Sequence, residues 1–276
     1  MKTILVLTDF SPAAEHAARY ALQLARALNL NIRLAHVRAE SEPELTSDQW
    51  GIYLKKLKKG FRIKAGEMPL PAITFIDVAG NWAAVIRKLA EEDRVPLVIM
   101  GLTGAGHRKD TWGTHVGQTL DILNAPLLLV PESATYRQIK KIGYATDLAN
   151  HELPLMRSVI TLARDFQAPL IFWYITMAET DQRSAKQKLD SLLAQVDGYS
   201  SNVKVSIRLL LAQNAAEGLY GIAENGDLQL LVVSHEHRPL LEYQTAPGHT
   251  LTLARQITIP LLVYPKHPTL EALTVF

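Results

Sequence analysis

The chain has 276 residues, of which 48% are hydrophobic and 20% are charged, a composition typical of globular proteins rather than disordered or fibrous ones. A formal net charge of +2 gives no sign of a surface for nucleic acid or for an anionic membrane. The absence of cysteine excludes disulfide bonds and thiolate metal sites.

The chain opens directly on an apolar strand at residues 3–7, with no charged and then apolar leader before it. No apolar run approaches the roughly 18 residues of a membrane span. We therefore expect a cytoplasmic protein with no membrane partner.

The first half of the chain reads as five strands that alternate with four helices. The strands are expected at residues 3–7, 31–37, 73–77, 96–100 and 127–131, and the helices at 11–28, 45–59, 81–93 and 113–123. The strands are nearly continuous apolar runs, which favours strands covered on both faces, as in parallel sheets. The alternation predicts a doubly wound α/β fold.

The helix at residues 11–28 carries clear end signals. Ser11 is suited to cap it, and Pro12 to occupy its first position, where a missing N–H costs nothing. Asn29 is a suitable stop. The many small alanines predict close packing on the sheet.

The second half repeats the first. One half opens on Ile4-Leu5-Val6-Leu7-Thr8-Asp9 and the other on Ile142-Gly143-Tyr144-Ala145-Thr146-Asp147, and each closes on a proline-led apolar strand. Strands are expected at residues 139–145, 169–175, 203–210, 229–233 and 260–264. We predict two domains, at residues 1–132 and 138–276, joined by a short polar linker at 132–138.

The last strand of each half is expected at a sheet edge, in the strand order 3-2-1-4-5. An edge presents N–H and C=O groups that must be paired or covered. We predict that the halves pair through these strands as a pseudo-dimer. The short linker favours pairing within the chain, and a homodimer of whole chains is a further option. The residues expected at the centre of this interface are Leu127, Leu129, Leu261 and Val263.

Ligands of doubly wound sheets bind beyond the carboxyl ends of the strands, where the strand order reverses. In the expected order this point lies between strands 1 and 4, which are followed by Asp9 and Gly101. Gly104 continues the loop, and Gly113-Thr114-His115 begins a helix whose free N–H groups suit a phosphate. Asp9 could accept hydrogen bonds from a ribose or a base, or hold a metal ion. Together these features predict a nucleotide site.

Each feature alone has a plainer structural explanation. Glycines after a strand are usually turn residues, and an Asp in this place usually caps a helix entry. There is no Walker A signature, and Gly104-Ala105-Gly106 follows the wrong strand for a dinucleotide fingerprint. No serine-histidine-acid set or pair of carboxylates favours hydrolytic catalysis.

A combination of motifs resembles the universal stress protein family, and it covers both halves as a tandem. The motifs are Leu7-Thr8-Asp9-Phe10-Ser11, Leu34-Ala35-His36-Val37, Val98-Ile99-Met100-Gly101-x-x-Gly104, Gly113-Thr114 and Ala125-Pro126-Leu127-Leu128-Leu129-Val130. Family members that bind ATP have a Gly-x2-Gly-x9-Gly-(Ser/Thr) loop. Here eight residues separate Gly104 from Gly113, one fewer than in that pattern.

The resemblance implies that the first half binds ATP or ADP, with or without Mg²⁺. The residues that would line the adenine and ribose end are Leu7, Thr8, Asp9 and Val37. Those of the middle of the pocket would be Met100, Gly101 and Gly104, and those at the phosphates Gly113, Thr114 and His115. In the shortened loop, His107, Arg108 and Lys109 either reach the phosphates or are exposed charges.

The second half keeps Asp147 and has Ile175 in place of Val37, but its loop differs in chemistry. His237 brings an imidazole where the family has glycine, and Pro247 removes an N–H donor from the phosphate cradle. We therefore expect this half not to bind ATP in the same way. His235-Glu236-His237 is either a polar loop, the simpler interpretation, or part of a metal site with His249.

Three functions are compatible with this sequence. The leading hypothesis is a non-catalytic module in which a nucleotide in the first half sets conformation or assembly. The alternative is a scaffold or interaction protein with two vestigial sites. A slow ATPase has the least support, because only His115 or His107 stands near the phosphate end as a general base.

Overall fold

The computed structural model describes residues 2–59, 69–92, 95–102, 114–147, 153–177, 182–196, 202–235, 253–254 and 256–265. The strands of the first half are β1 (Thr3–Leu7), β2 (Asn31–Arg38), β3 (Ile73–Ala79), β4 (Val98–Leu102) and β5 (Leu127–Pro131). Those of the second half are β6 (Ile142–Thr146), β7 (Leu170–Thr176), β8 (Val205–Leu211), β9 (Leu230–His235) and β10 (Leu261–Pro265).

The described helices lie between these strands. They are α1 (Pro12–Ala27), α2 (Ser47–Lys58), α3 (Trp82–Glu92), α4 (Thr114–Ile122), α5 (Leu153–Asp165), α6 (Gln182–Val196) and α7 (Ala215–Asn225). None of them is long and apolar enough to cross a membrane.

All ten strands belong to one sheet, in the order β3-β2-β1-β4-β5-β10-β9-β6-β7-β8. Within each half the neighbouring strands run parallel. The order 3-2-1-4-5 predicted from the sequence is therefore confirmed in both halves. The doubly wound α/β fold is confirmed with it.

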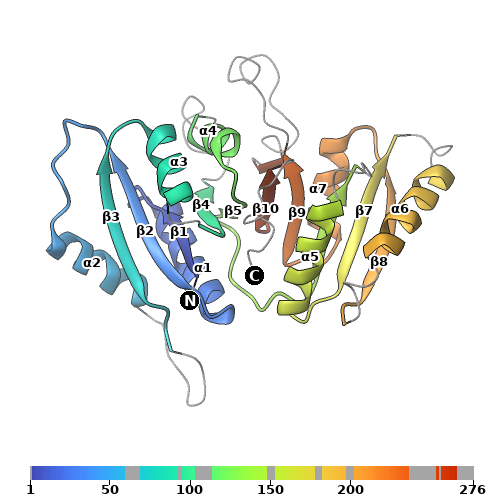
Figure 1. Ribbon diagram of the computed structural model, residues 1–276, viewed down its shortest axis with the longest axis horizontal. Helices are drawn as coiled ribbons and strands as arrows, with labels where there is room; N and C mark the ends of the chain where they lie inside the picture. The colour runs from blue at the N-terminus through green and yellow to red at the C-terminus, as the bar shows by residue number, and fades with distance from the viewer. Residues whose placement is uncertain are drawn as a thin grey trace.

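The two halves meet through β5 and β10, which pair antiparallel at the centre of the sheet (Figure 1). The register places Leu129 opposite Leu261 and Leu127 opposite Val263. All four side chains are buried. The predicted pseudo-dimer through the last strands is confirmed, whereas the domain bounds 1–132 and 138–276 stay predictions.

Helices cover both faces of the sheet. One face is packed under α1, α2, α5 and α6, and the other under α3, α4 and α7. Both faces of the central strands are therefore apolar, which explains why their sequences are continuous rather than alternating.

Helix α1 is set by the end signals read from the sequence. The Ser11 hydroxyl accepts a hydrogen bond from Ala14 N, and Pro12 occupies the first turn. Asn29 ends the segment with a φ of 53°. A Cβ built on Gly101 of β4 would lie 2.4 Å from the Ala13 carbonyl oxygen, so α1 packs directly on that glycine.

Several strand bounds differ from the sequence predictions by two or three residues. The fourth strand begins at Val98 rather than at residue 96, and β6 begins at Ile142 rather than at residue 139. Leu97 and Ile139 are buried although they lie outside the strands. A pattern of hydrophobic residues reports burial rather than strand bounds. The Leu97 carbonyl still accepts a hydrogen bond from Leu5 N of β1, at 3.0 Å.

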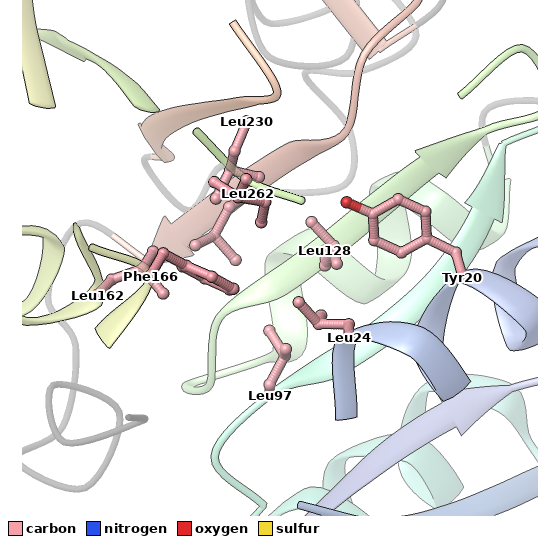
Figure 2. Close-up of a pocket in the computed structure, with 9 residues that line it drawn as sticks. Tyr20, Leu24, Leu97, Leu128, Leu162, Phe166, Leu230 and Leu262 are labelled. Atoms are coloured by element: carbon pink, nitrogen blue, oxygen red, sulfur yellow. The ribbon is translucent and has the colours of Figure 1, made fainter. Parts of the chain in front are cut away.

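A small apolar cavity lies where the halves meet, on the face of α1 and α5 (Figure 2). Its volume is about 10 Å³, close to the least that a single water needs. The first half contributes Tyr20, Leu24, Leu97 and Leu128, and the second half contributes Ile139, Leu162, Phe166, Leu230 and Leu262. Such a cavity is too small for an organic ligand and reflects imperfect packing of the junction.

Candidate functional site

Three apolar side chains gather at the point where the strand order reverses. Leu7 ends β1, Val37 lies near the end of β2, and Met100 lies in β4 beside β1. All three belong to the apolar cluster on the face of α3 and α4. The structure thus brings together residues that are 93 positions apart in the sequence, as predicted for the carboxyl edge.

Asp9 follows β1 and is exposed at this edge. Its Oδ1 accepts a hydrogen bond from Ser11 N at 3.0 Å, so the carboxylate also stabilises the turn into α1. Phe10, between them, has a φ of 62°, where a bulky side chain is strained. The Phe10 ring packs against Tyr53 and His36, and this packing holds the turn in place.

Thr8 is buried, and its hydroxyl is used within the fold. It accepts a hydrogen bond from Phe10 N at 3.1 Å and lies 3.0 Å from the Tyr53 hydroxyl of α2. Burial raises the pKa of Tyr53 to about 12, while the hydrogen bond with Thr8 acts in the opposite direction. Thr8 therefore joins the end of β1 to α2.

His115 stands in the first turn of α4 and is exposed. Its ring lies 4.5 Å from the ring of Trp82, measured between centroids. Loss of hydration against its neighbours lowers the pKa of His115, and the Asp9 carboxylate partly opposes that change. The ring is therefore mostly neutral at pH 7 and within electrostatic reach of Asp9.

Thr119 fixes Trp82 and His115 relative to one another. The indole Nε1–H of Trp82 donates to Thr119 Oγ1 at 3.1 Å, and that hydroxyl donates to the His115 carbonyl at 2.6 Å. Trp82 was missed in the sequence as a site residue. Its signal is an aromatic side chain in the first turn of a helix that follows the carboxyl end of a strand.

The glycine loop is only partly described. Gly101 lies in β4, and Thr114 begins α4. Gly104 and Gly113 lie outside the described residues, as do the loop charges His107, Arg108 and Lys109. The roles predicted for these five residues stay predictions.

Gly101 is required by the fold itself, since a Cβ there would meet the backbone of α1. Its presence therefore carries no information about a ligand. Ser234 of β9 corresponds to Gly101 in the second half. Ser234 lies beside Tyr264 of β10, and Gly101 lies beside Val130 of β5 in the same register.

The second half has a bulkier side chain at the corresponding edge. Trp173 of β7 lies beside Ala145 of β6, and Ala35 of β2 lies beside Leu7 of β1 in the same register. Trp173 therefore corresponds to Ala35, and an indole replaces a methyl group. Trp173 is only 8% exposed, and Arg208 lies 5.3 Å from the centre of its ring. The second edge therefore differs from the first in its strands as well as in its loop.

His235 of the predicted polar or metal-binding loop is buried and faces Asp121 at 3.7 Å. Glu236, His237, Pro247 and His249 lie outside the described residues. Within the part of the chain that the structure describes, no three histidine, aspartate or glutamate side chains gather as a metal site.

Comparisons with known proteins agree with this architecture. The model of the universal stress protein family matches residues 1–131. No curated protein matches the chain in sequence.

Solved structures share the fold over nearly the whole chain, and three of them illustrate this. A universal stress protein from Archaeoglobus fulgidus DSM 4304 is 12% identical, with a TM-score of 0.70, over 96% of this chain and 98% of that one. A protein of unknown function from Pseudomonas aeruginosa PAO1 is 13% identical, with a TM-score of 0.62, over 97% and 93%. The cytoplasmic domain of a prokaryotic cation chloride cotransporter is 12% identical, with a TM-score of 0.59, over all of both chains.

At these identities the structural likeness shows the fold alone, and it extends over both halves. The family match over residues 1–131 identifies the first half directly. Residues 1–131 therefore belong to the universal stress protein family, and the chain consists of two halves of that fold in tandem.

Proposed function

We propose that the first half binds an adenine nucleotide, ATP or ADP, with or without Mg²⁺, at the carboxyl edge of β1 and β4. The observation that carries this proposal is the convergence of three different groups on that edge. They are an apolar wall, an exposed carboxylate and the N-terminus of α4.

Each group suits one part of a nucleotide. Val37 and Met100, which are half-buried, offer an apolar surface to the base, and the buried Leu7 belongs to the same cluster. The Asp9 carboxylate can accept hydrogen bonds from ribose hydroxyls. The first turn of α4 offers backbone N–H groups and the positive end of the helix dipole to phosphates, with His115 beside them.

The proposal extends to the loop residues Gly104 and Gly113 by resemblance to the family. By the same resemblance, a bound nucleotide would change the conformation or the assembly of the chain. We propose a binding module rather than an enzyme. The second half, with Trp173 at its edge, would not take a nucleotide in the same way.

The first test is to purify the protein without added ligand, denature it and analyse the supernatant for adenine nucleotides. Calorimetry with ADP and with ATP, with and without Mg²⁺, then gives the stoichiometry. We expect one equivalent per chain. Two equal equivalents would contradict the assignment to the first half, and no binding would favour the scaffold alternative.

Two matched variants locate the site. Asp9→Ala should weaken nucleotide binding by about 1–3 kcal/mol, the cost of losing hydrogen bonds to a charged group. Asp147→Ala removes the corresponding carboxylate of the second half and should leave the affinity unchanged. Equal effects of the two variants would contradict the proposal.

A further inference from the structure

Asp121 occupies an unfavourable place on α4. It lies in the last turn of the helix, where the dipole presents its negative end, and its side chain is only 9% exposed. A buried carboxylate at this end needs a compensating group. His235 lies beside it: its Nε2 is 3.7 Å from Asp121 Oδ1, and its side chain is only 5% exposed.

His235 comes from the other half of the chain. It ends β9 and pairs with Pro265 of β10, just as Leu102 ends β4 and pairs with Pro131 of β5. Leu102 is buried, so the position is apolar in the first half. In the second half the same position holds a histidine, which faces a helix of the first half.

The pair therefore fixes α4 to the second half. Both side chains are buried, so a change in either of them disturbs a closely packed contact between the two halves. The pair lies on the α4 face of the junction, while the apolar side chains of Figure 2 fill the opposite face.

Helix α4 carries this restraint to the candidate site. His115 and Asp121 are six residues apart, so they lie roughly 9 Å apart along the helix axis. Between them, Thr119 bonds both to Trp82 and to the His115 carbonyl. A shift at the Asp121 end would therefore displace Trp82 and His115 at the other end.

We propose that His235 is a positioning residue of the first-half site, supplied by the second half. Through Asp121 it holds α4 so that the helix N-terminus and His115 meet the phosphates of the nucleotide. The inference rests on the proposed nucleotide site. It gives the second half a role in binding although its own edge is altered.

The test uses the intact chain with three variants and a control. His235→Leu introduces the side chain that the first half has at the corresponding position, Leu102. Asp121→Asn removes the negative charge of the acid. His235→Gln keeps a donor of similar reach. Ser133→Ala is the control, since the Ser133 hydroxyl donates across the same junction, to the Thr258 carbonyl at 3.4 Å, away from α4.

Two readouts are measured on each protein. The first is the indole N–H resonance of Trp82 in ¹⁵N-labelled protein without ligand, assigned with Trp82→Phe. The second is the ADP affinity by calorimetry. We expect His235→Leu and Asp121→Asn to shift the Trp82 resonance and to weaken ADP binding about tenfold. His235→Gln should recover both, and Ser133→Ala should change neither.

A merely structural pair would give a different result. In that case His235→Leu would lower the midpoint of urea unfolding while the Trp82 resonance and the ADP affinity of the folded protein stayed as in the wild type, and the inference would be overturned. If the wild type bound no ADP, the proposed function would fail. The ligand-free Trp82 resonance would still decide whether His235 positions α4.

Discussion

At the scale of single residues, some residues of the candidate site stabilise the fold and others are exposed to a ligand. Thr8 and Gly101 serve the fold, one by joining β1 to α2 and the other by letting α1 approach β4. Asp9 and His115 are exposed at the carboxyl edge. Variants of the first pair should therefore alter stability. Variants of the second pair should alter binding, and at Asp9 also stability, because its Oδ1 accepts a hydrogen bond from Ser11 N.

Gly101→Ala should destabilise the protein. Its Cβ would meet the Ala13 carbonyl, and overpacking of this kind costs about 1–3 kcal/mol. Gly51→Ala is the matched control, because a Cβ in that helix would meet nothing, and it should stabilise by roughly 0.5–1 kcal/mol. Urea unfolding measures both. Equal changes in the unfolding midpoint would contradict the close packing of α1 on β4.

Nucleotide affinity should depend on pH through His115. The pKa of its ring in the free protein is below the ordinary value of about 6.5. A bound phosphate favours the charged ring, so it would raise this pKa, and binding would take up a proton. The contribution of the charged His115 ring to the nucleotide affinity is complete below the pKa of His115 in the free protein. It is lost as the pH rises through the pKa of His115 in the complex.

Calorimetry with ADP from about pH 5.5 to about pH 8.5 tests this linkage. The slope added by one ring is at most about tenfold in affinity per pH unit. In His115→Gln the phosphates of the nucleotide still titrate, but there is no ring at position 115 to titrate. Parallel profiles for the wild type and the variant would show that His115 does not sense the phosphates.

Residues that act through distant partners could not be predicted from the sequence. The glycine at position 101 is visible, but only the structure shows that α1 rather than a ligand requires it. Trp82 looks like an ordinary helix residue until its contact with His115 is known. His235 suggested a polar loop, yet it is buried against a helix of the other half.

At the scale of elements, the order of strands was predictable because continuous apolar runs between helices leave few ways to wind a parallel sheet. The ends of the strands were harder to place. Ile139 is as apolar as the strand that follows it and is buried without belonging to it, because a hydrophobic pattern does not distinguish burial from strand pairing. The cap of α1 was predictable, since Ser11 and Pro12 act locally.

The junction of β5 and β10 should be sensitive to a buried charge. Leu129 is fully buried opposite Leu261, so Leu129→Asp should destabilise the protein by about 4 kcal/mol or more. Leu211→Asp at the outer strand β8 is the control, since Leu211 is 48% exposed, and it should change stability by less than about 1 kcal/mol. Thermal unfolding compares the two melting temperatures.

At the scale of the whole molecule, the two halves are parts of one sheet rather than separate bodies on a linker. Apolar clusters on both faces contain residues of both halves. The chain should therefore scatter X-rays in solution as a single compact particle. Small-angle scattering that required two independently moving lobes would contradict the continuous sheet.

The pair of Asp121 and His235 also bears on symmetry. Two identical chains that met through the same strand would form every contact twice, because an isologous interface repeats each of them about its two-fold axis. In this chain the sequence repeat places Leu102 and Arg255 at the reciprocal positions, in place of a histidine and an aspartate. Fusion lets each half change alone: a protein made from two copies of the first half would keep the apolar strand junction and lose this contact.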